Sequence, residues 1–356
     1  MILSTLDRYI GKSMLGAIFA TLFALVGLSG IIKFVEQFSK IGRGSYDMVQ
    51  AALYTILTMP KDVETFFPMA ALLGALMALG NLASRSELVV MQAAGLSRLK
   101  IGMAVMKTAL PLIIITMLIG EWGVPQTEQF ARDMRAKAIY GGSVLSVKNS
   151  IWAKDGHDFV YVRRINANMN LQDVTIYSFN DQRELQKIRY AQKANFKDKK
   201  WTLVNIKESL FAKDNVTTNQ IKSLSWNTSL TPDKLGIASL RPTSLSMSGL
   251  YEYIQFMKQT GQNPKRFELT FWQRIFQPIS VSIMMLLALS FIFGQLRGVT
   301  AGARIVTGIC FGFLFYVINE VFGRLSLIFD FSAILGALMP SIFFISIIWW
   351  LLHRKV

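Results

Sequence analysis

Long apolar runs alternate with short charged segments along most of the chain. Six runs approach or exceed the roughly 20 residues that a helix needs to cross a bilayer, at residues 13–32, 65–84, 101–124, 275–296, 305–322 and 331–352. The third run is interrupted by Lys107 and Glu121 near its two ends. An uncharged stretch at 48–60 is too short to span and is expected to extend the second helix or to lie in the interface. The pattern predicts an α-helical polytopic membrane protein with six transmembrane helices.

The region between the third and fourth runs has a different pattern. Apolar residues alternate with polar ones or run together, as in β-strands, at 151–162, 174–179 and 201–206. Turn residues stand beside these stretches in the pairs Asp155-Gly156, Asn180-Asp181 and Lys197-Asp198. The pattern predicts a soluble all-β domain, inserted between three spans and three spans, with the length of a small sandwich or jelly roll.

The two patterns divide the chain into three parts. Residues 1–125 hold the first three transmembrane helices and a short cytoplasmic helix within 84–100. Residues 126–270 form the β-jellyroll-like domain, and residues 271–356 hold the last three transmembrane helices. A helix with Ser248 as a candidate N-cap and Gly261 as its stop is expected to lead from the β domain to the fourth span.

Composition supports a membrane protein and excludes several classes of site. The chain is 52% hydrophobic and 17% charged, and its net charge of +16 fits anionic lipid better than nucleic acid in so apolar a chain. The single cysteine, Cys310, excludes an internal disulfide, and two distant histidines argue against a histidine-based metal site or triad. The glycine-rich stretch 294–302 lacks the lysine of a phosphate loop, so no nucleotide site of its own is expected.

The short loops indicate the orientation of the spans. Positive charges cluster at both ends of the chain, between the second and third runs and between the fourth and fifth, at Arg8 and Lys12; Arg85, Arg98, Lys100 and Lys107; Arg297 and Arg304; and His353, Arg354 and Lys355. Six spans place all four groups on one side, which the positive-inside rule makes the cytoplasm. Both termini are then expected in the cytoplasm and the β domain in the periplasm.

A short, nearly all-apolar helix is predicted in the charged loop between the second and third spans. Ser84 and Glu87 have the spacing of a capping box, and Gly95 can adopt the left-handed conformation that ends a helix. Such a helix outside the bilayer is expected to bury itself in a partner, and we predict that the partner is a separate ATPase. Glu87 can serve as a helix cap, contact that partner, or do both.

Five cations fall near the opposite, outer membrane boundary, namely Lys33, Lys40, Lys61, Arg132 and Arg135. One interpretation is ordinary charge pairing, with Glu36, Asp62 and Glu64 as partners. The other is a group of cations that receives the phosphates of an anionic lipid. Because the positive-inside rule disfavours external lysines, we favour the second interpretation.

Other candidate residues have a functional and a structural interpretation. Glu121 and Glu320 lie near the outer ends of their spans, where pairing, for example with Arg324, is favoured over a role in the bilayer. Several aromatic residues either pack in the core or line an apolar cavity, among them Phe66, Phe67, Phe313, Phe315 and Tyr316. The polar residues Asp155, His157 and Asp158 are expected to form a hairpin tip rather than a metal site.

Several stretches of the chain resemble the LptF/LptG family of lipopolysaccharide-export permeases. They are LDRYIGK at 6–12, LSGIIKFVEQF at 28–38, KDVETFFPMAALLGAL at 61–76, SELVVMQAAG at 86–95 and LSFIFGQLR at 289–297. The resemblance covers essentially the whole chain and implies three spans, a periplasmic β-jellyroll and three more spans.

The resemblance also implies a function and partners. The chain would pair with the permease LptF above two copies of the ATPase LptB, which binds ATP and Mg²⁺, so no cofactor is expected on this chain. Lipopolysaccharide would leave the outer leaflet of the inner membrane and pass to the bridge that begins with LptC. The helix within 84–95 would be the coupling helix, with contacts from Ser84, Arg85, Glu87, Leu88, Met91 and Gly95.

The same resemblance implies roles for the outer residues. The five cations would contact the phosphates and inner-core charge of the lipid. Phe66, Phe67, Phe315, Tyr316 and Glu320 would line the cavity that holds it. Two alternatives stay open: a membrane enzyme that acts on a lipid-linked glycan with Glu121 or Glu320 as its acid, and an ABC subunit that transmits force without carrying lipid.

Overall fold

The computed structural model describes residues 4–140, 151–165, 170–197, 200–212, 215–231, 242–293 and 299–353, and its contacts divide the chain into two compact units. We call the first the helical unit; it comprises Met1–Val35, Thr58–Thr127 and Lys265–Val356. The second, the β-containing unit, comprises Glu36–Leu57 and Glu128–Pro264. The β-containing unit thus combines Glu36–Leu57, which lies between the first two spans, with the segment that follows the third span.

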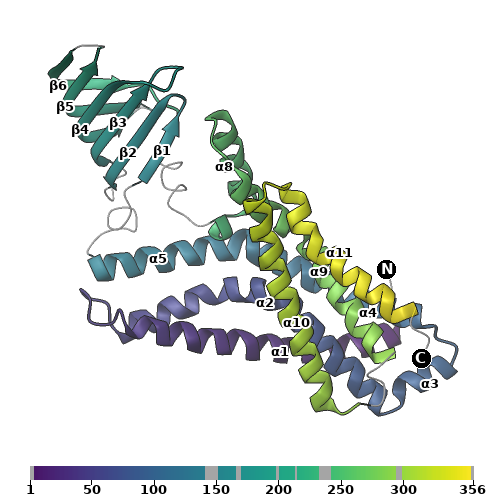
Figure 1. Cartoon of the computed structure of the whole chain (residues 1–356). Coiled ribbons are helices and arrows are strands. Elements are labelled where there is room, and N and C mark those ends of the chain that lie inside the picture. Colours follow the sequence, from purple (N-terminus) through teal and green to yellow (C-terminus); the bar gives the residue numbers. More distant parts are fainter. Residues whose placement is uncertain are drawn as a thin grey trace. The chain divides into compact units, whose positions relative to one another are not determined.

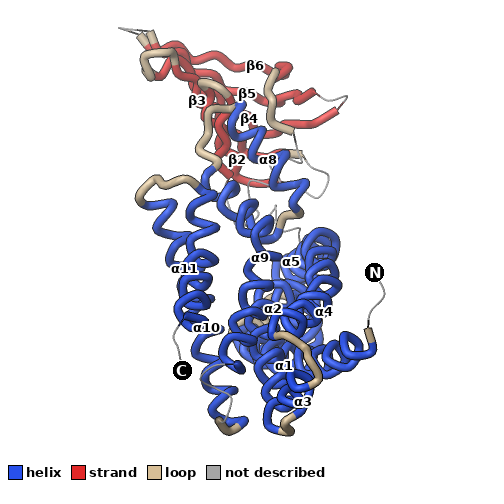
Figure 2. The backbone as a smooth tube through the Cα atoms, turned by 90° about the vertical axis from the view of Figure 1, so that its right-hand side faces the viewer, coloured by secondary structure: helices blue, strands red, loops and turns tan. Residues whose placement is uncertain are grey.

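Six helical segments of the described chain are long and apolar enough to cross a membrane, as the sequence pattern predicts. They are Thr5–Phe38, Met48–Ser84, Arg98–Ile139, Lys265–Phe293, Ala301–Ile328 and Ala333–Leu351. The helices that form them are α1 (Thr5–Phe38), α2 (Met48–Ser84), α4 (Arg98–Leu118) continued by α5 (Val124–Tyr140), α9 (Lys265–Phe293), α10 (Ala301–Ile328) and α11 (Ala333–His353). Figure 2 shows α10 and α11 side by side.

Two details of the helices resolve open points. The stretch 48–60 belongs to α2, so it extends the second helix. The third span passes from α4 to α5 through a π-helical turn at Ile119–Gly123, which contains Glu121. Such turns widen a helix locally and often accompany functional sites.

Helix α2 is the centre of the helical unit. In its most apolar window 72% of the residues are buried, against 17% in α1 and in α10. Its side chains Leu72, Leu76 and Leu79 are fully buried in a core shared with residues of α1, α4 and α9. The outer faces of α1 and α10 are left open in this chain, as expected for helices that meet lipid or another membrane protein.

Glycines on α2 and α10 allow the helices to approach closely. A Cβ atom on Gly74 of α2 would lie 2.5 Å from Cα of Ile18 on α1, so only a glycine fits at this crossing. Gly308 and Gly312 of α10 meet the side chains of Leu73 and Met69 on α2 in the same way. Small residues at helix crossings are the usual means of tight packing between membrane helices.

The β-containing unit holds one antiparallel sheet of six described strands in the order β1-β2-β3-β4-β5-β6 (Figure 1). The strands are β1 (Ile151–Asp155), β2 (Asp158–Ile165), β3 (Leu171–Phe179), β4 (Leu185–Lys197), β5 (Lys200–Phe211) and β6 (Val216–Trp226). This confirms the inserted β domain. The described strands follow an up-and-down meander, however, and not the Greek-key connections that define a jelly roll.

The turn predictions can be compared with the strands one by one. Gly156 lies in the β1–β2 hairpin with φ of 61°, and the Asn180-Asp181 turn joins β3 to β4, so both turns are confirmed. Part of the Lys197-Asp198 pair lies outside the described residues. Large apolar residues at alternate positions of a strand are buried, as are Val160 and Val162 of β2 and Val174 and Ile176 of β3.

The helix after the sheet, α8 (Met247–Gln259), begins two residues earlier than predicted. Its N-cap is Ser246, whose hydroxyl accepts a hydrogen bond from the backbone N–H of Gly249 at 3.1 Å. The expected cap Ser248 lies inside the first turn. The predicted stop is confirmed, because Gly261 has a φ of 67°.

The Gly74–Ile18 crossing yields a first prediction. Substituting Gly74→Ala should lower the thermal stability of the purified protein, because the added Cβ collides with the backbone of α1. The matched control is Gly16→Ala on α1, where a Cβ meets nothing within 4 Å. Alanine favours a helix over glycine by about 1 kcal/mol, so the control should leave stability unchanged or raise it. Equal melting temperatures for the two variants would contradict the crossing.

Candidate functional site

The short helix between the second and third spans is α3 (Glu87–Ala93). The sequence predicted Ser84 as its N-cap, but the helix begins at Glu87. The capping box was wrong. The residue before the helix is Ser86, which has a left-handed φ of 61° and makes no side-chain cap. Ser84 instead ends α2, where its hydroxyl donates to the carbonyl oxygen of Asn81 at 2.9 Å. Because the predicted cap does not form, the carboxylate of Glu87 is left for another contact.

That contact comes from α1. The hydroxyl of Tyr9 donates a hydrogen bond of 2.7 Å to Oε2 of Glu87, which ties α3 to the first helix. Sequence reasoning missed Tyr9, since residues 78 positions apart in the chain give no local signal. A second link near the same end of α1 joins Lys107 of α4 to Asp7 at 2.7 Å. The base of the helical unit is therefore fastened by two polar contacts on α1.

Helix α3 has a buried side and an open side. Leu88 is buried, and Met91 packs partly against the core. On the open side, the side chains of Val89 and Val90 are 41% and 66% exposed. The predicted stop at Gly95 is confirmed, with a φ of 86° and a hydrogen bond from the next amide, of Leu96, back to Met91. The helix thus presents two valines beside the acid that Tyr9 holds, while Arg85 is exposed at its start.

Two of the five predicted cations lie in the helical unit, and both form ion pairs. Nζ of Lys33 lies 2.6 Å from Asp62, which also accepts from the hydroxyl of Ser29. Nζ of Lys61 lies 2.8 Å from Glu64. The charge-pairing interpretation is therefore realised for Asp62 and Glu64. A lysine has three N–H donors, so pairing does not prevent it from also contacting a phosphate.

Glu64 has a second cationic neighbour that sequence reasoning missed. Nε of Arg274 on α9 lies 3.4 Å from Oε1 of Glu64, and both side chains are more than 90% buried. The backbone carbonyl of Glu64 also accepts from the side-chain amide of Gln277. On α4–α5, Gly120 leaves room for the carboxylate, since a Cβ there would lie 3.2 Å from it. Three segments thus meet around one buried acid.

The other three cations lie in the β-containing unit. Arg132 donates to Glu128 at 3.1 Å and to the hydroxyl of Ser244 at 2.7 Å. The guanidinium carbon of Arg135 lies 4.3 Å from the ring centre of Tyr54, a cation–π contact. Nζ of Lys40 donates to the side chain of Gln37 at 3.2 Å. In the described part of the chain, Arg135 has no carboxylate at ion-pair distance, so its charge is open to an anion.

The charge of Arg135 acts on a neighbouring tyrosine, Tyr46. Burial raises the pKa of its hydroxyl, and the positive charge of Arg135 acts in the opposite direction. A cavity of about 420 Å³ lies in the same unit, lined by residues that include Ser45, Asp133 and Lys137. Lys137 is a further cation of α5 that was not among the predicted site residues.

The five residues predicted to line a cavity have different environments. Phe67 is 1% exposed and belongs to the core, and Phe315 packs edge-to-face against Phe344 at 5.4 Å, so both support helix packing within the chain. Phe66 is half-buried and Tyr316 is 48% exposed, which leaves both able to meet a ligand. Glu320 is exposed and pairs with Arg324 at 2.8 Å, as its structural interpretation expected.

The polar residues of the hairpin tip also have structural contacts. The carboxylate of Asp155 accepts hydrogen bonds from the hydroxyls of Thr228 and Ser229 and from the amide of Ser229. It thereby holds the segment after β6 against β1, a contact that the predicted role in the hairpin turn did not include.

Comparison with known proteins identifies the family. A family model described as the lipopolysaccharide export system permease LptF/LptG matches residues 8–354. The chain belongs to the LptF/LptG family. It is 66% identical over 355 residues to the lipopolysaccharide export system permease protein LptG of Haemophilus influenzae, with 99% of each chain covered. It is 54% identical to LptG of Escherichia coli strain K12 over 353 residues, with 98% of each chain covered.

These relatives confirm the LptF/LptG resemblance and its branch. The relatives that match over nearly the full length carry the LptG name. Among the stretches quoted above, those at 28–38 and 61–76 contain Lys33 and Lys61, and that at 86–95 contains most of the coupling segment. The membrane-enzyme alternative is not favoured, because the relatives are named as permeases.

The buried acid of this LptF/LptG chain yields a second prediction. Replacing Glu64→Gln leaves the charge of Arg274 buried without its counter-charge, and breaking a buried pair costs about 3–5 kcal/mol. The melting temperature in detergent should therefore fall markedly. Glu320→Gln is the control, since an exposed pair contributes about 0–1 kcal/mol. A Glu64→Gln protein as stable as the control would show that the acid is not a structural centre.

The contact between Tyr9 and Glu87 yields a third prediction. Tyr9→Phe removes the hydroxyl and keeps the ring, so α3 should lose its link to α1 and the amides of 87–95 should exchange hydrogen faster. Hydrogen exchange measured by mass spectrometry would show this, with exchange in α9 as the internal reference. Unchanged protection of 87–95 would mean that Tyr9 does not hold α3.

Proposed function

We propose that the chain is the membrane subunit of an ABC transporter that extracts lipopolysaccharide from the outer leaflet of the inner membrane. One observation carries the proposal beyond family membership. Tyr9, which holds Glu87, and Lys33, which pairs with Asp62, lie on the same helix α1. At 1.5 Å per residue they are about 36 Å apart along it, slightly more than the hydrocarbon thickness of a bilayer. The α3 contact and the first cations thus belong to opposite membrane boundaries.

The orientation follows from that separation and from the positive loops. The α3 end carries Arg85, Arg98 and Lys100, which the positive-inside rule assigns to the cytoplasm. The end with Lys33 and Lys61, and with it the β domain, then faces the periplasm, and both termini face the cytoplasm. Cations at the periplasmic boundary are suited to an anionic lipid in the outer leaflet.

The ATPase is proposed as a separate partner, LptB, present as a dimer. The sequence contains no phosphate loop, so the energy must come from another chain. Helix α3 supplies a surface for it: Val89 and Val90 are open, and Glu87 is held in place by Tyr9. Because α3 is tied to α1 and packs on the core through Leu88, a push on α3 is passed directly to the transmembrane helices.

The lipid explains why a second permease, LptF, is proposed. A lipid with on the order of 60 methylene groups would cost about 50 kcal/mol to expose to water, at about 0.8 kcal/mol per group. Its chains therefore need an apolar enclosure throughout transfer. The open faces of α1 and α10 supply one side of such an enclosure, with Tyr316 exposed on α10. A second permease would supply the other side, and LptC would receive the lipid.

The cations are proposed to hold the phosphates and inner-core charge of the lipid. Lys33 and Lys61 pair with Asp62 and Glu64, which lowers the free-energy cost of burying their charges. Arg135 lies against the ring of Tyr54 and has no such acidic partner within the described residues. Hydrogen bonds between cations and phosphate are about twice as strong as neutral ones. ATP-driven closure would then release the lipid if the closed state binds it less tightly than the open state.

A reconstituted export assay tests the proposal. Vesicles that contain the chain with LptF, LptB and LptC should release lipopolysaccharide to an acceptor in the presence of ATP, and omission of any one permease should abolish release. Turnover of a lipid-linked glycan by the chain alone would instead favour an enzyme. Normal release with lipid that never crosslinks to this chain would favour a force-transmitting subunit.

The cation assignment yields a fourth prediction. Arg135→Gln should reduce photocrosslinking of lipopolysaccharide to the complex about tenfold, the equivalent of roughly 1.4 kcal/mol, because an open charge is lost without breaking an ion pair. The control is Arg183→Gln in the exposed β3–β4 turn. Equal crosslinking in both variants would remove Arg135 from the site.

The coupling assignment yields a fifth prediction. Glu87→Ala should weaken co-purification of LptB and lower ATP hydrolysis by the complex, while the melting temperature of the chain stays near its normal value. Arg324→Ala, which breaks an exposed ion pair near the other end of α10, is the control for association with LptB. Unchanged association and hydrolysis in Glu87→Ala would contradict the role of α3.

A further inference from the structure

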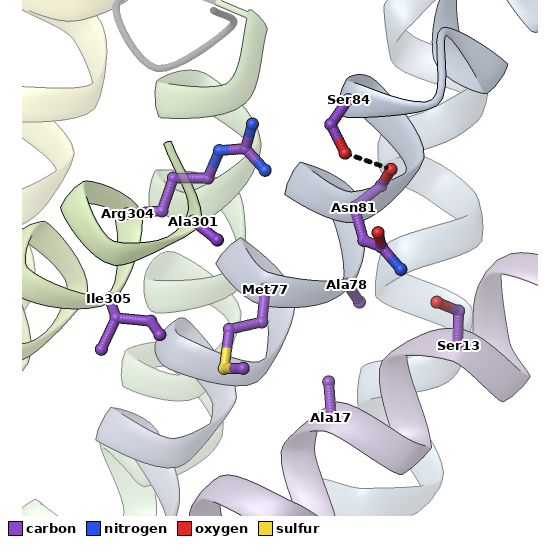
Figure 3. Close-up of a pocket in the computed structure, with 9 residues that line it drawn as sticks. All are labelled: Ser13, Ala17, Met77, Ala78, Asn81, Ser84, Ala301, Arg304 and Ile305. Atoms are coloured by element: carbon purple, nitrogen blue, oxygen red, sulfur yellow. Dashed lines mark hydrogen bonds between the residues drawn. The ribbon is translucent and has the colours of Figure 1, made fainter. Parts of the chain in front are cut away.

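A cavity of about 300 Å³ lies between α1, α2 and α10 at the α3 end of the helical unit (Figure 3). Ser13 of α1, Asn81 of α2 and Arg304 of α10 contribute its polar lining. No acidic residue is among the described residues that line it. The cavity is distinct from the lipopolysaccharide site, because Ser13 and Lys33 are separated by about 30 Å along α1.

Arg304 is the unusual feature of this cavity. The residue is 5% exposed, and its Nε atom is buried without a hydrogen-bond partner. Within the described residues, its guanidinium forms neither a hydrogen bond nor an ion pair. The other deeply buried arginine, Arg274, lies against the carboxylate of Glu64. Of the two buried arginines, one therefore has an acidic partner within the described residues and the other has none. A buried cation without a counter-charge is costly unless a ligand supplies one.

The surrounding chain is built around this side chain. A Cβ on Gly80 of α2 would lie 2.5 Å from Nη1 of Arg304 and 2.7 Å from Cδ, so the glycine provides the space in which the arginine lies. Arg304 also stands in the first turn of α10, which begins at Ala301 after the N-cap Thr300. The positive end of a helix dipole disfavours a cation and favours an anion. The guanidinium of Arg304 and the positive end of the α10 dipole therefore both favour an anionic ligand.

Two further donors face the cavity. The side-chain amide of Asn81 and the hydroxyl of Ser13 line it, and neither side chain has a hydrogen-bond partner within the described residues (Figure 3). Ser84 also lines it, but its hydroxyl donates to the carbonyl of Asn81. A guanidinium, an amide and a hydroxyl together match the several oxygens of a phosphate group.

The rest of the lining is apolar and continues along the helix. Ala17, Met77 and Ile305 form the apolar wall. On α10, Ile309 and Phe313 follow Ile305 at intervals of four residues and are 45% and 60% exposed. Residues at this spacing lie on one helix face, so an apolar stripe leads from the cavity toward the middle of the span. A soluble anion would use the polar end alone, whereas a phospholipid uses both.

We propose that this cavity binds one anionic phospholipid of the leaflet on the α3 side. Its phosphate lies on Arg304, with Asn81 and Ser13 as further donors, and one acyl chain follows the stripe from Ile305 to Phe313. The bound lipid neutralises a charge between three helices that the chain itself leaves uncompensated. The proposal requires that the helices span a membrane, and it is independent of which lipid is exported.

Native mass spectrometry of the purified, delipidated complex tests the proposal. The complex is titrated with phosphatidylglycerol and, separately, with phosphatidylcholine of the same acyl chains. Phosphatidylglycerol retention should fall about tenfold in Arg304→Gln, a loss of roughly one charged contact, and also in Gly80→Ala, which displaces the arginine. Lys100→Gln, which removes an exposed cation on the same side, should retain the lipid as the unsubstituted complex does.

Each other result overturns the proposal. Equal phosphatidylglycerol retention in Arg304→Gln and the unsubstituted complex would show that the cavity does not hold the headgroup. Equal loss with phosphatidylcholine would show that charge is not recognised. Displacement of the lipid by inorganic phosphate at millimolar concentration would identify a free-anion site that does not use the apolar stripe.

A measurement on the unsubstituted complex guards against variants that fail to fold. Phosphatidylglycerol with a photoactivatable acyl chain should crosslink to the peptides that contain Met77 and Ile305, above the level reached by the phosphatidylcholine analogue. No crosslink there, together with dissociation of a partner chain in Arg304→Gln, would assign the counter-charge to a protein carboxylate and would refute the lipid.

Discussion

The structure depends on how charges are accommodated in membrane-spanning helices. Taking an ion out of water is costly, and the cost is met when a partner of opposite charge is held close. In the helical unit Lys33 has Asp62, Lys107 has Asp7, and Glu64 has both Lys61 and Arg274. These pairs join α1 to α2, α1 to α4 and α2 to α9. The charged residues therefore determine which helices are neighbours, in addition to any role in binding.

Close packing by glycine is the second part of the same arrangement. Gly74 of α2 and Gly308 and Gly312 of α10 leave space for the neighbouring helix where a Cβ atom would collide. Gly120 leaves space in the same way for the carboxylate of Glu64. A low local dielectric strengthens a satisfied pair and penalises an unsatisfied one. Packing and electrostatics thus reinforce each other around α2.

The sequence predicted what depends on local pattern. The apolar runs predicted the six spans, and the alternation of apolar and polar residues predicted the β domain. Gly95 and Gly261 predicted two helix ends, because glycine readily adopts a positive φ. Family resemblance was strong because its stretches were long. The capping box at Ser84 and Glu87 failed because a left-handed residue at Ser86 intervenes, and a backbone angle at a serine leaves no trace in residue spacing.

Contacts between distant segments were beyond the sequence. Neither Arg274 nor Tyr9 was among the candidate residues, because their partners Glu64 and Glu87 lie far away in the chain. Phe67 and Phe315 could not be separated from Phe66 and Tyr316, since rotation of a helix by one residue decides which side chain is buried. In each case the deciding fact is which face of one helix meets another.

The accommodation of charge also bears on how a cation can serve both structure and transport. Lys33 and Lys61 are each bound to a carboxylate, so a phosphate that approaches them meets a site already close to neutral. Such a site binds through additional N–H donors and gains less than an open cation would. Arg135 is held by an aromatic ring, which leaves its charge uncancelled. A transporter needs its cargo to leave as well as to bind. If the proposed site includes both kinds of cation, paired lysines would add moderate affinity while their helices keep their carboxylate partners when the lipid departs, and the open arginine would add the larger attraction.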